Sequence, residues 1–228
     1  NNDQRAGEFN RAREDRYQGG DLRGLARRLN YIRGLGATAL WITPPVANQW
    51  IGPSGPNDGG AGGHGGYHGY WAEHFMQVDK HLGTLADYQR LSRQLHQRGM
   101  VLVQDIVLNH TGNYFGQAGP WSAADPSAHM VRYLSTPPVP APRQAPFNLN
   151  DARDPAQRAA AIYHWTPDVA DYTDPVQERN FQMSGLDDLN TENPVVMRAL
   201  RRSYAHWIRA AGVDAFRVDT AFYVPPET

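Results

Sequence analysis

The sequence predicts an α/β protein built around a mainly parallel sheet. Helical patterns alternate with short apolar runs along the chain, and polar or turn-forming residues follow each apolar run. Strands that alternate with helices form parallel sheets with right-handed crossovers. The 228 residues suffice for one large domain or two small ones. Periodicity leaves two architectures open, namely a doubly wound open sheet and a (β/α)8 barrel.

Three segments have the periodicity and the end signals of helices. The first is 21–36, where leucine and isoleucine recur at three- and four-residue steps. The second is 84–99, where Thr84 and Asp87 resemble a capping box. The third begins at Asn193, a capping residue followed by proline. We expect a helix in each of these places.

Three apolar runs predict strands, and two other segments interrupt the alternation. The run 38–42 ends at two prolines and is expected to be buried on both faces; 101–108 and 213–218 are the other two. The segment 52–69 holds nine of the 22 glycines and predicts a surface loop. The segment 110–188 holds ten of the 17 prolines and is too long for a plain loop, which indicates a small irregular subdomain.

Composition excludes several classes of protein. A formal net charge of −1 argues against a nucleic-acid-binding protein, because a phosphate backbone requires clustered positive charge. The absence of cysteine excludes disulfides, thiolate metal sites and a cysteine nucleophile. No apolar run approaches the roughly 18 residues that span a bilayer, so we expect no membrane insertion.

Polar side chains fall at the carboxyl ends of two predicted strands. Asp105 lies inside an apolar strand that Asn109 and His110 follow, while Arg217 and Asp219 close a second strand on one face. Ligands of parallel α/β proteins bind at this edge of the sheet. A buried Asp105 that merely accepts backbone hydrogen bonds is an equal alternative. The pairing of Arg217 with Asp219 favours a functional interpretation.

These motifs resemble those of the α-amylase family of glycoside hydrolases. The segment 105–110 is similar to the first family signature, 216–219 to the second, and 188–190 to the short motif between them; 67–71 also matches. The resemblance covers nearly the whole chain. It favours the barrel over the open sheet, and implies a (β/α)8 (TIM) barrel fragment with an irregular domain inserted after the third strand.

The resemblance also implies a division of the chain. Residues 1–109 would form the N-terminal part of the catalytic barrel, 110–188 the inserted second domain, and 189–228 the continuation of the barrel through its fourth strand. The first strand and the remaining barrel would lie outside these residues, in the same gene product.

The family assigns chemistry to the matching residues. Asp219 corresponds to the nucleophile of a retaining glycosidase, and Arg217 would favour its ionised form. His68 and His110 correspond to residues that hydrogen-bond the sugar hydroxyls, and Tyr70 to the ring that stacks on that sugar. We therefore expect hydrolysis of α-1,4-glucosidic bonds in starch, maltodextrins or cyclodextrins.

Two alternatives to a hydrolase remain, a transglycosylase of the same family and a catalytically silent carbohydrate-binding homologue. The general acid of the family is a glutamate well beyond Asp219. Glu227 is only eight residues further on, in a proline-bounded turn, and is not assigned that role. Phe222 and Tyr223 stand where amylases commonly have Lys-His on the leaving-group side, which leaves acceptor preference open.

The resemblance implies calcium as a cofactor, held by oxygen ligands. Asn109 and Asp188 match family ligands, and the backbone carbonyl of Tyr223 could replace the usual histidine carbonyl. A second calcium site is suggested by four residues near the N-terminus, for which an Asn-rich turn and a helix cap are the alternative. These residues are Asn1, Asn2, Gly19 and Asp21. Calcium and the substrate class together lead us to expect a secreted or periplasmic protein.

Overall fold

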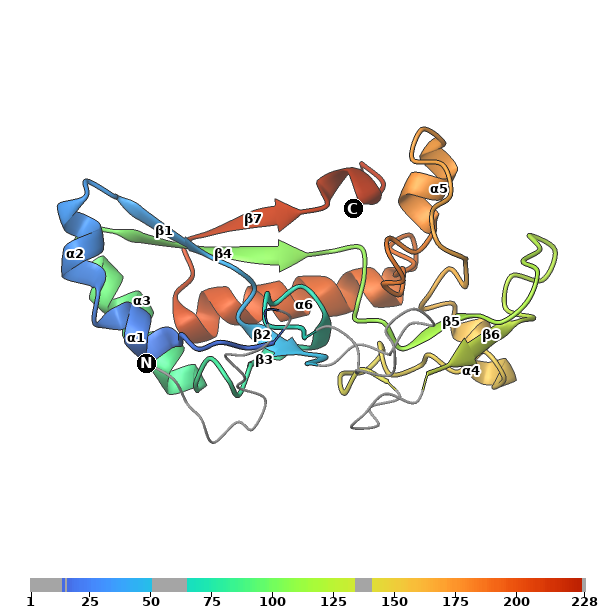
Figure 1. Ribbon diagram of the computed structural model, residues 1–228, viewed down its shortest axis with the longest axis horizontal. Helices are drawn as coiled ribbons and strands as arrows, with labels where there is room; N and C mark the ends of the chain where they lie inside the picture. The colour runs from blue at the N-terminus through green and yellow to red at the C-terminus, as the bar shows by residue number, and fades with distance from the viewer. Residues whose placement is uncertain (1–13, 15, 51–64, 134–140, 227–228) are drawn as a thin grey trace.

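The centre of the fold is a sheet of three parallel strands, with β4 between β1 and β7 (Figure 1). The strands are β1 (Ala39–Ile42), β4 (Val101–Val107) and β7 (Ala215–Asp219). The register pairs Trp41 with Val103 and Asp105 with Arg217. The computed structural model describes residues 14, 16–50, 65–133 and 141–226. The three predicted strands are confirmed, and their carboxyl ends share one edge of the sheet.

Four helices accompany this sheet. They are α1 (Leu22–Ala26), α2 (Leu29–Gly34), α3 (Leu85–His96) and α6 (Pro194–Ala211). The predictions for the second and third helices are confirmed. The prediction of a single helix over 21–36 is wrong. The helix is interrupted at Arg28, whose φ of −104° and ψ of 2° are not helical. Periodicity identifies the apolar face of such a segment and does not report a change of axis within it.

The shorter elements lie outside the sequence-based expectations. Strands β2 (Val46–Asn48) and β3 (Ala72–Val78) form an antiparallel pair, and so do β5 (Phe115–Gln117) and β6 (Met130–Arg132). Between β6 and α6 lie α4 (Pro155–Ala160) and α5 (Pro175–Asn180), and the 3₁₀ turn η2 (Ala221–Tyr223) follows β7. In the part of the chain that the structure describes, no helix is long and apolar enough to cross a membrane.

The core lies between the sheet and helices α3 and α6. Tyr88 and Leu91 of α3 and Trp207 of α6 have no exposed surface. The Trp207 indole N–H donates to the carbonyl of Phe75 on β3 at 2.8 Å, and the Tyr204 hydroxyl donates to the carbonyl of Val107 on β4. Helix α6 therefore contacts both the central sheet and the β2–β3 pair.

The expectation that 38–42 is buried on both faces is wrong. Trp41 is 57% exposed. Among the described residues β1 has a single strand neighbour, β4, so one edge and much of one face of β1 are uncovered.

Hydrogen bonds between the Gln49 side chain, directly after β2, and the backbone of Asn113 join the region 110–188 to the β2 segment. The amide of Gln49 donates to the carbonyl of Asn113 at 2.6 Å, and its oxygen accepts from the Asn113 backbone N–H at 2.8 Å. A Cβ added at Gly112 would lie 2.6 Å from that side-chain oxygen. Glycine is therefore required here by space, since a side chain would displace Gln49.

Helix α3 depends on the reciprocal cap predicted from sequence. The Thr84 hydroxyl accepts from the Asp87 backbone N–H at 3.2 Å, and the Asp87 carboxylate accepts from the Thr84 backbone N–H at 3.1 Å. We expect Thr84→Ala to lower the free energy of unfolding of the full-length protein by about 1 kcal/mol. Thr84→Ser keeps the hydroxyl and should be neutral. Equal thermal midpoints for the two variants would contradict this role of the cap.

Candidate active site

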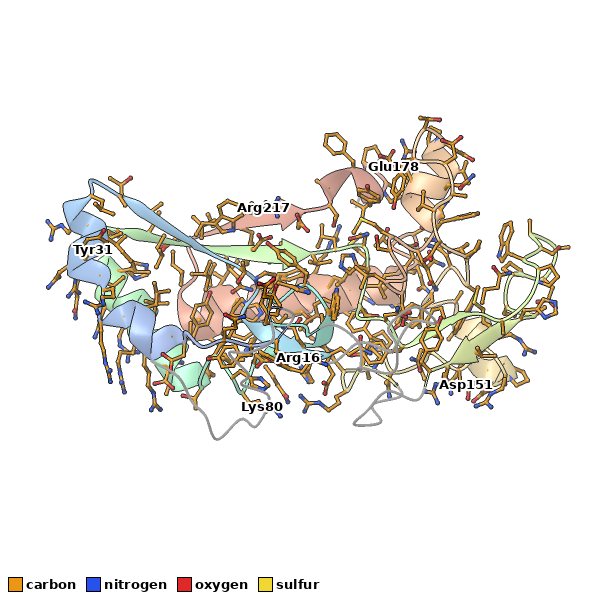
Figure 2. The ribbon with its side chains drawn as sticks, in the orientation of Figure 1. Arg16, Tyr31, Lys80, Asp151, Glu178 and Arg217 are labelled. Atoms are coloured by element: carbon orange, nitrogen blue, oxygen red, sulfur yellow. The ribbon has the colours of Figure 1, made fainter. Side chains whose placement is uncertain are left out.

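The residues predicted to act together converge at the carboxyl edge of the central sheet. Asp105 lies on the middle strand, directly opposite Arg217 in the register. Arg217 and Asp219 are two residues apart on β7, so their side chains share a face. Figure 2 shows Arg217 on β7. Helix α5, which carries Glu178, lies beyond the turn that follows β7.

The Asp105 carboxylate is the centre of this cluster. Asp105 has no exposed surface, so its charge must be compensated by hydrogen-bond donors. Its Oδ2 atom accepts from the Tyr70 hydroxyl at 3.0 Å, from the Trp41 indole N–H at 3.1 Å and from Arg217 Nη1 at 3.1 Å. The alternative of a buried aspartate that merely accepts backbone hydrogen bonds does not describe this geometry, because every one of these donors is a side chain.

Arg217 connects Asp105 to Asp219. Its Nη1 atom donates to both carboxylates. Burial alone would lower the pKa of Arg217, but hydrogen bonds to Asp105 and Asp219 raise it above its ordinary value. The guanidinium is therefore a permanent positive charge between two acidic side chains. Such a charge favours the ionised form of a neighbouring carboxylate.

Tyr70 is held as a hydrogen-bond donor. Burial, together with the hydrogen bond to Asp105, raises the pKa of Tyr70 to about 12. The ring of His68 stacks on the Tyr70 ring, with centroids 5.7 Å apart and planes inclined by 24°. His68 Nδ1 accepts from the backbone N–H of Tyr70 at 3.1 Å, which leaves Nε2 to carry the proton of the neutral ring.

His110 is fully enclosed beneath this group. Burial lowers the pKa of His110 to about 4, so the ring is neutral at neutral pH. Its Nε2 atom lies 3.1 Å from the carbonyl of Tyr70, and its Nδ1 atom lies 2.8 Å from Asn109 Oδ1. A neutral imidazole has one proton and donates to only one of these oxygens. His110 therefore positions the loop that holds Tyr70.

The residues predicted to bind calcium also come together. Asp188 pairs with His110 in an isolated bridge, and the backbone N–H of Leu189 donates to the carbonyl of Asn109 at 2.7 Å. The Thr220 hydroxyl donates to Asn109 Oδ1 at 2.6 Å, and the backbone N–H of Tyr223 donates to the carbonyl of Thr220. Asn109 is thus linked to Leu189, next to Asp188, and to Thr220, which begins the turn that contains Tyr223.

The donor chemistry of this place fits calcium. Its oxygens are an amide, a carboxylate and a backbone carbonyl, which hard cations prefer. Among the described residues no group of three or more His, Cys, Asp or Glu side chains could hold a metal ion, so a site here depends on the amide and carbonyl oxygens.

A histidine that the sequence motifs did not single out contacts Asp188. His164 Nδ1 lies 2.5 Å from Asp188 Oδ2, and His164 Nε2 lies 3.2 Å from Glu192 Oε2. Burial raises the pKa of Asp188 to about 7, although the hydrogen bond from His164 opposes that rise. This contact joins the region 110–188 to the segment that leads into α6.

The second predicted calcium site has little described structure. Asn1 and Asn2 lie outside the described residues. Asp21 caps α1 by accepting from the Gly24 backbone N–H at 2.6 Å, and Gly19 has a φ of 108°. Asp21 thus has the helix-cap role that the sequence offered as the alternative. Glu227 also lies outside the described residues.

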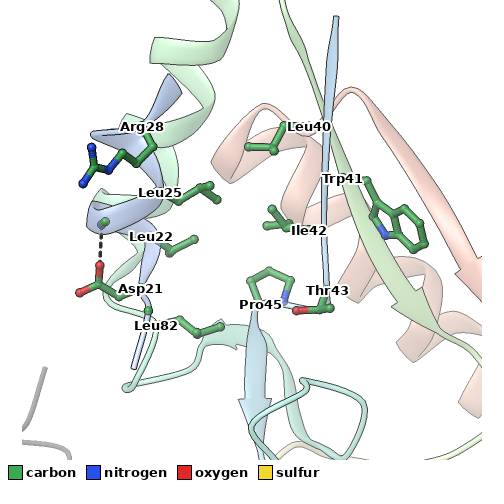
Figure 3. Close-up of a pocket in the computed structure, with 12 residues that line it drawn as sticks. Asp21, Leu22, Leu25, Arg28, Leu40, Trp41, Ile42, Thr43, Pro45 and Leu82 are labelled. Atoms are coloured by element: carbon green, nitrogen blue, oxygen red, sulfur yellow. Dashed lines mark hydrogen bonds between the residues drawn. The ribbon is translucent and has the colours of Figure 1, made fainter. Parts of the chain in front are cut away.

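One apolar cavity of the described structure lies away from this cluster. A pocket of about 540 Å³ lies between α1 and β1, on the side of the strand that carries Leu40 and Ile42 (Figure 3). Leu22 and Leu25 of α1 form its other wall. An apolar pocket without a carboxylate pair is unsuited to glycosidic chemistry.

Comparison with known proteins identifies the family. A family model for the α-amylase catalytic domain matches residues 6–227. The chain belongs to the α-amylase family. The catalytic domain of this family is a (β/α)8 barrel, and β1, β4 and β7 with their helices are an α/β part of it.

Individual members of the α-amylase family are similar over most of this chain. It is 34% identical to an α-amylase of Streptomyces lividans, over 92% of this chain and 25% of that enzyme. It is also 34% identical to a cyclomaltodextrin glucanotransferase of Klebsiella oxytoca, over 90% of this chain and 27% of that enzyme. The chain therefore spans about a quarter of the length of these relatives.

Solved structures of the α-amylase family share the fold. An α-amylase from Geobacillus thermoleovorans, complexed with acarbose, superposes with a TM-score of 0.65 at 33% identity, over 92% of this chain and 36% of that one. The cyclomaltodextrin glucanotransferase CldA superposes with a TM-score of 0.75 at 27% identity, over 97% of this chain and 41% of that one. Hydrolases and transferases both occur among these relatives.

Proposed function

We propose that this chain provides the nucleophile side of an active site that cleaves α-1,4-glucosidic bonds in starch, maltodextrins or cyclodextrins with retention of configuration. The observation that carries the proposal is the Asp105–Arg217–Asp219 cluster at the carboxyl ends of parallel strands, in a chain of the α-amylase family. Active sites of barrel enzymes lie at this edge.

The proposed reaction has two displacements at the anomeric carbon. Asp219 attacks that carbon, the bond to the glycosidic oxygen breaks, and the leaving oxygen takes a proton from a general acid. Water, deprotonated by the same group, then displaces Asp219 and restores the free carboxylate. The general acid of a retaining enzyme lies about 5–5.5 Å from the nucleophile, and we propose that a glutamate outside residues 1–228 supplies it.

The remaining residues of the cluster prepare Asp219 and the sugar. Arg217 orients the nucleophile by donating to it and places a positive charge beside it. His68 carries its proton on Nε2 and donates it in a hydrogen bond to a sugar hydroxyl. The Tyr70 ring, which stacks on His68, packs against the face of the sugar. The family resemblance implies that His110 hydrogen-bonds a sugar hydroxyl, but it is buried and both its ring nitrogens lie against protein oxygens, so its proposed part is to support the Tyr70 loop.

Replacement of the nucleophile tests this proposal. Asp219→Asn keeps the size and removes the charge that attacks carbon, so we expect release of reducing ends from soluble starch by the full-length protein to fall about 10³-fold or more. Asp125→Asn, at an exposed carboxylate of the region 110–188, is the control and should retain wild-type activity.

Each other outcome has a definite meaning. Equal activity of wild type and Asp219→Asn would contradict the nucleophile assignment. A wild-type protein that binds α-glucans without cleaving them would instead be the catalytically silent homologue. No action on, or binding of, any α-glucan would overturn the substrate class.

A transglycosylase is the second candidate, and Phe222 favours it. In that reaction a sugar hydroxyl instead of water displaces Asp219. Phe222 is 82% exposed on η2, three residues after Asp219, where amylases commonly have a lysine. The turn is fixed to β4 by the Thr220–Asn109 hydrogen bond. An exposed ring on a fixed turn beside the nucleophile is suited to stack an acceptor sugar.

Product analysis tests the acceptor role. Stacking contributes about 1 kcal/mol, so Phe222→Ala should lower the ratio of transfer to hydrolysis products about fivefold. Phe222→Tyr keeps the ring and should keep the ratio. Chromatography of products from maltooligosaccharides measures it. An unchanged ratio in Phe222→Ala would remove Phe222 from the acceptor site.

We further propose calcium at the junction of Asn109, Asp188 and the Tyr223 carbonyl. When bound, the ion would join the region 110–188, as an inserted second domain, to the barrel; it would supply structural cross-linking. The N-terminal set with Asn1, Asn2, Gly19 and Asp21 is a second, weaker proposal, because its described members support only a helix cap.

Metal removal tests the first calcium site. The full-length protein should contain calcium by elemental analysis, and chelation should lower its thermal midpoint, because a ligand that binds only the folded state stabilises it. Asp188→Asn should lose the metal, whereas Asp168→Asn, in the same region, should retain it. Absence of calcium together with an unchanged midpoint after chelation would contradict the site.

We propose a periplasmic or secreted location. A relative from Escherichia coli that is 29% identical over 91% of this chain is named a periplasmic α-amylase. Cell fractionation with an antibody against the protein tests this location.

A further inference from the structure

Trp41 contacts both charged groups that control Asp219. It is the third residue of β1, and its side chain points to the opposite side of the strand from Leu40 and Ile42, which face the apolar pocket (Figure 3). Neither the strand pattern nor the family motifs single it out.

The indole N–H of Trp41 completes the set of donors to Asp105. It donates to Oδ2 at 3.1 Å, the same atom that accepts from Tyr70 and Arg217. Because β4 lies between β1 and β7, Trp41 and Arg217 approach Asp105 from opposite neighbouring strands. The carboxylate is thereby held from both sides.

The face of the same indole lies against Arg217. The guanidinium carbon is 5.2 Å from the ring centroid, which is within the range of a cation–π contact. An indole has an electron-rich face for a cation and an N–H edge for an anion. Trp41 therefore binds the Asp105–Arg217 pair through both members at once.

Directed contacts, and not packing within the described part of the chain, distinguish this side chain. Trp41 is 57% exposed in the described part of the chain, whereas Trp207 of the core has no exposed surface. What Trp41 contributes is orientation. Trp41 holds the Asp105 carboxylate by a hydrogen bond and contacts the guanidinium that donates to Asp219.

We propose that Trp41 is a positioning residue for the nucleophile, acting through Asp105 and Arg217. The inference rests on the proposed function of Asp219. Trp41 is expected to affect the turnover of bound substrate more than its binding, since its polar contact is with the protein.

Kinetics of the full-length protein test the inference. Trp41→Phe keeps a ring and removes the N–H, and a hydrogen bond to a charged group of this kind corresponds to about a tenfold change. We expect kcat on maltooligosaccharides to fall about tenfold with KM little changed. Trp121→Phe is the matched control, since it also removes one indole N–H bond, to the carbonyl of Trp165 at 3.2 Å.

The contrary results are distinct. An unchanged kcat in Trp41→Phe would overturn the inference while leaving the proposed function intact. A raised KM with unchanged kcat would also overturn it, and would make Trp41 a substrate contact. Inactivity of wild type and Trp121→Phe on every α-glucan would instead be a failure of the proposed function.

A second measurement does not depend on activity. Hydrogen exchange of the Trp41 indole N–H, followed by NMR, should be slow in the wild type and fast in Asp105→Ala, whose side chain has no acceptor for this N–H. Slow exchange that persists in Asp105→Ala, or fast exchange in the wild type, would overturn the inference even where Trp41→Phe fails to fold.

Discussion

The burial of one carboxylate on the middle strand organises this edge of the structure. A carboxyl group without exposed surface is tolerated only when hydrogen-bond partners surround it, and Asp105 receives donors from β1, from the loop of Tyr70 and from β7. Each donor must arrive in a fixed place. The register of the three strands and the path of that loop therefore follow from a single electrostatic requirement, which also places Arg217 beside Asp219.

The region 110–188 is held at the same edge by contacts of a different kind. Gln49 binds the backbone of Asn113 through both ends of its amide, and Gly112 leaves the space for this approach. Asn109 joins the end of β4 to the turn after β7 through Thr220. The site is thus bounded by the segments that follow β4 and β7 as well as by the strands themselves, and such loops at a strand edge commonly carry binding residues.

Aromatic side chains connect this scaffold to its proposed chemistry. Tyr70 and Trp41 each present a polar edge to Asp105 and a ring face to another group, His68 in one case and Arg217 in the other. Phe222 has no such anchor and is exposed. In the proposed enzyme, Trp41 would position the nucleophile and Tyr70 would pack against the sugar that is attacked. Phe222 would contact the acceptor sugar.

The sequence by itself determined the strands β4 and β7, the helices α3 and α6, and the residues of the family motifs, because these depend on local periodicity, caps and short signatures. Tertiary structure decided the rest. The donors Trp41 and Arg217 lie 64 and 112 residues from Asp105, and no local pattern reports contacts at such separations. The exposure of β1 and the contact of His164 with Asp188 likewise depend on which segments the fold brings side by side.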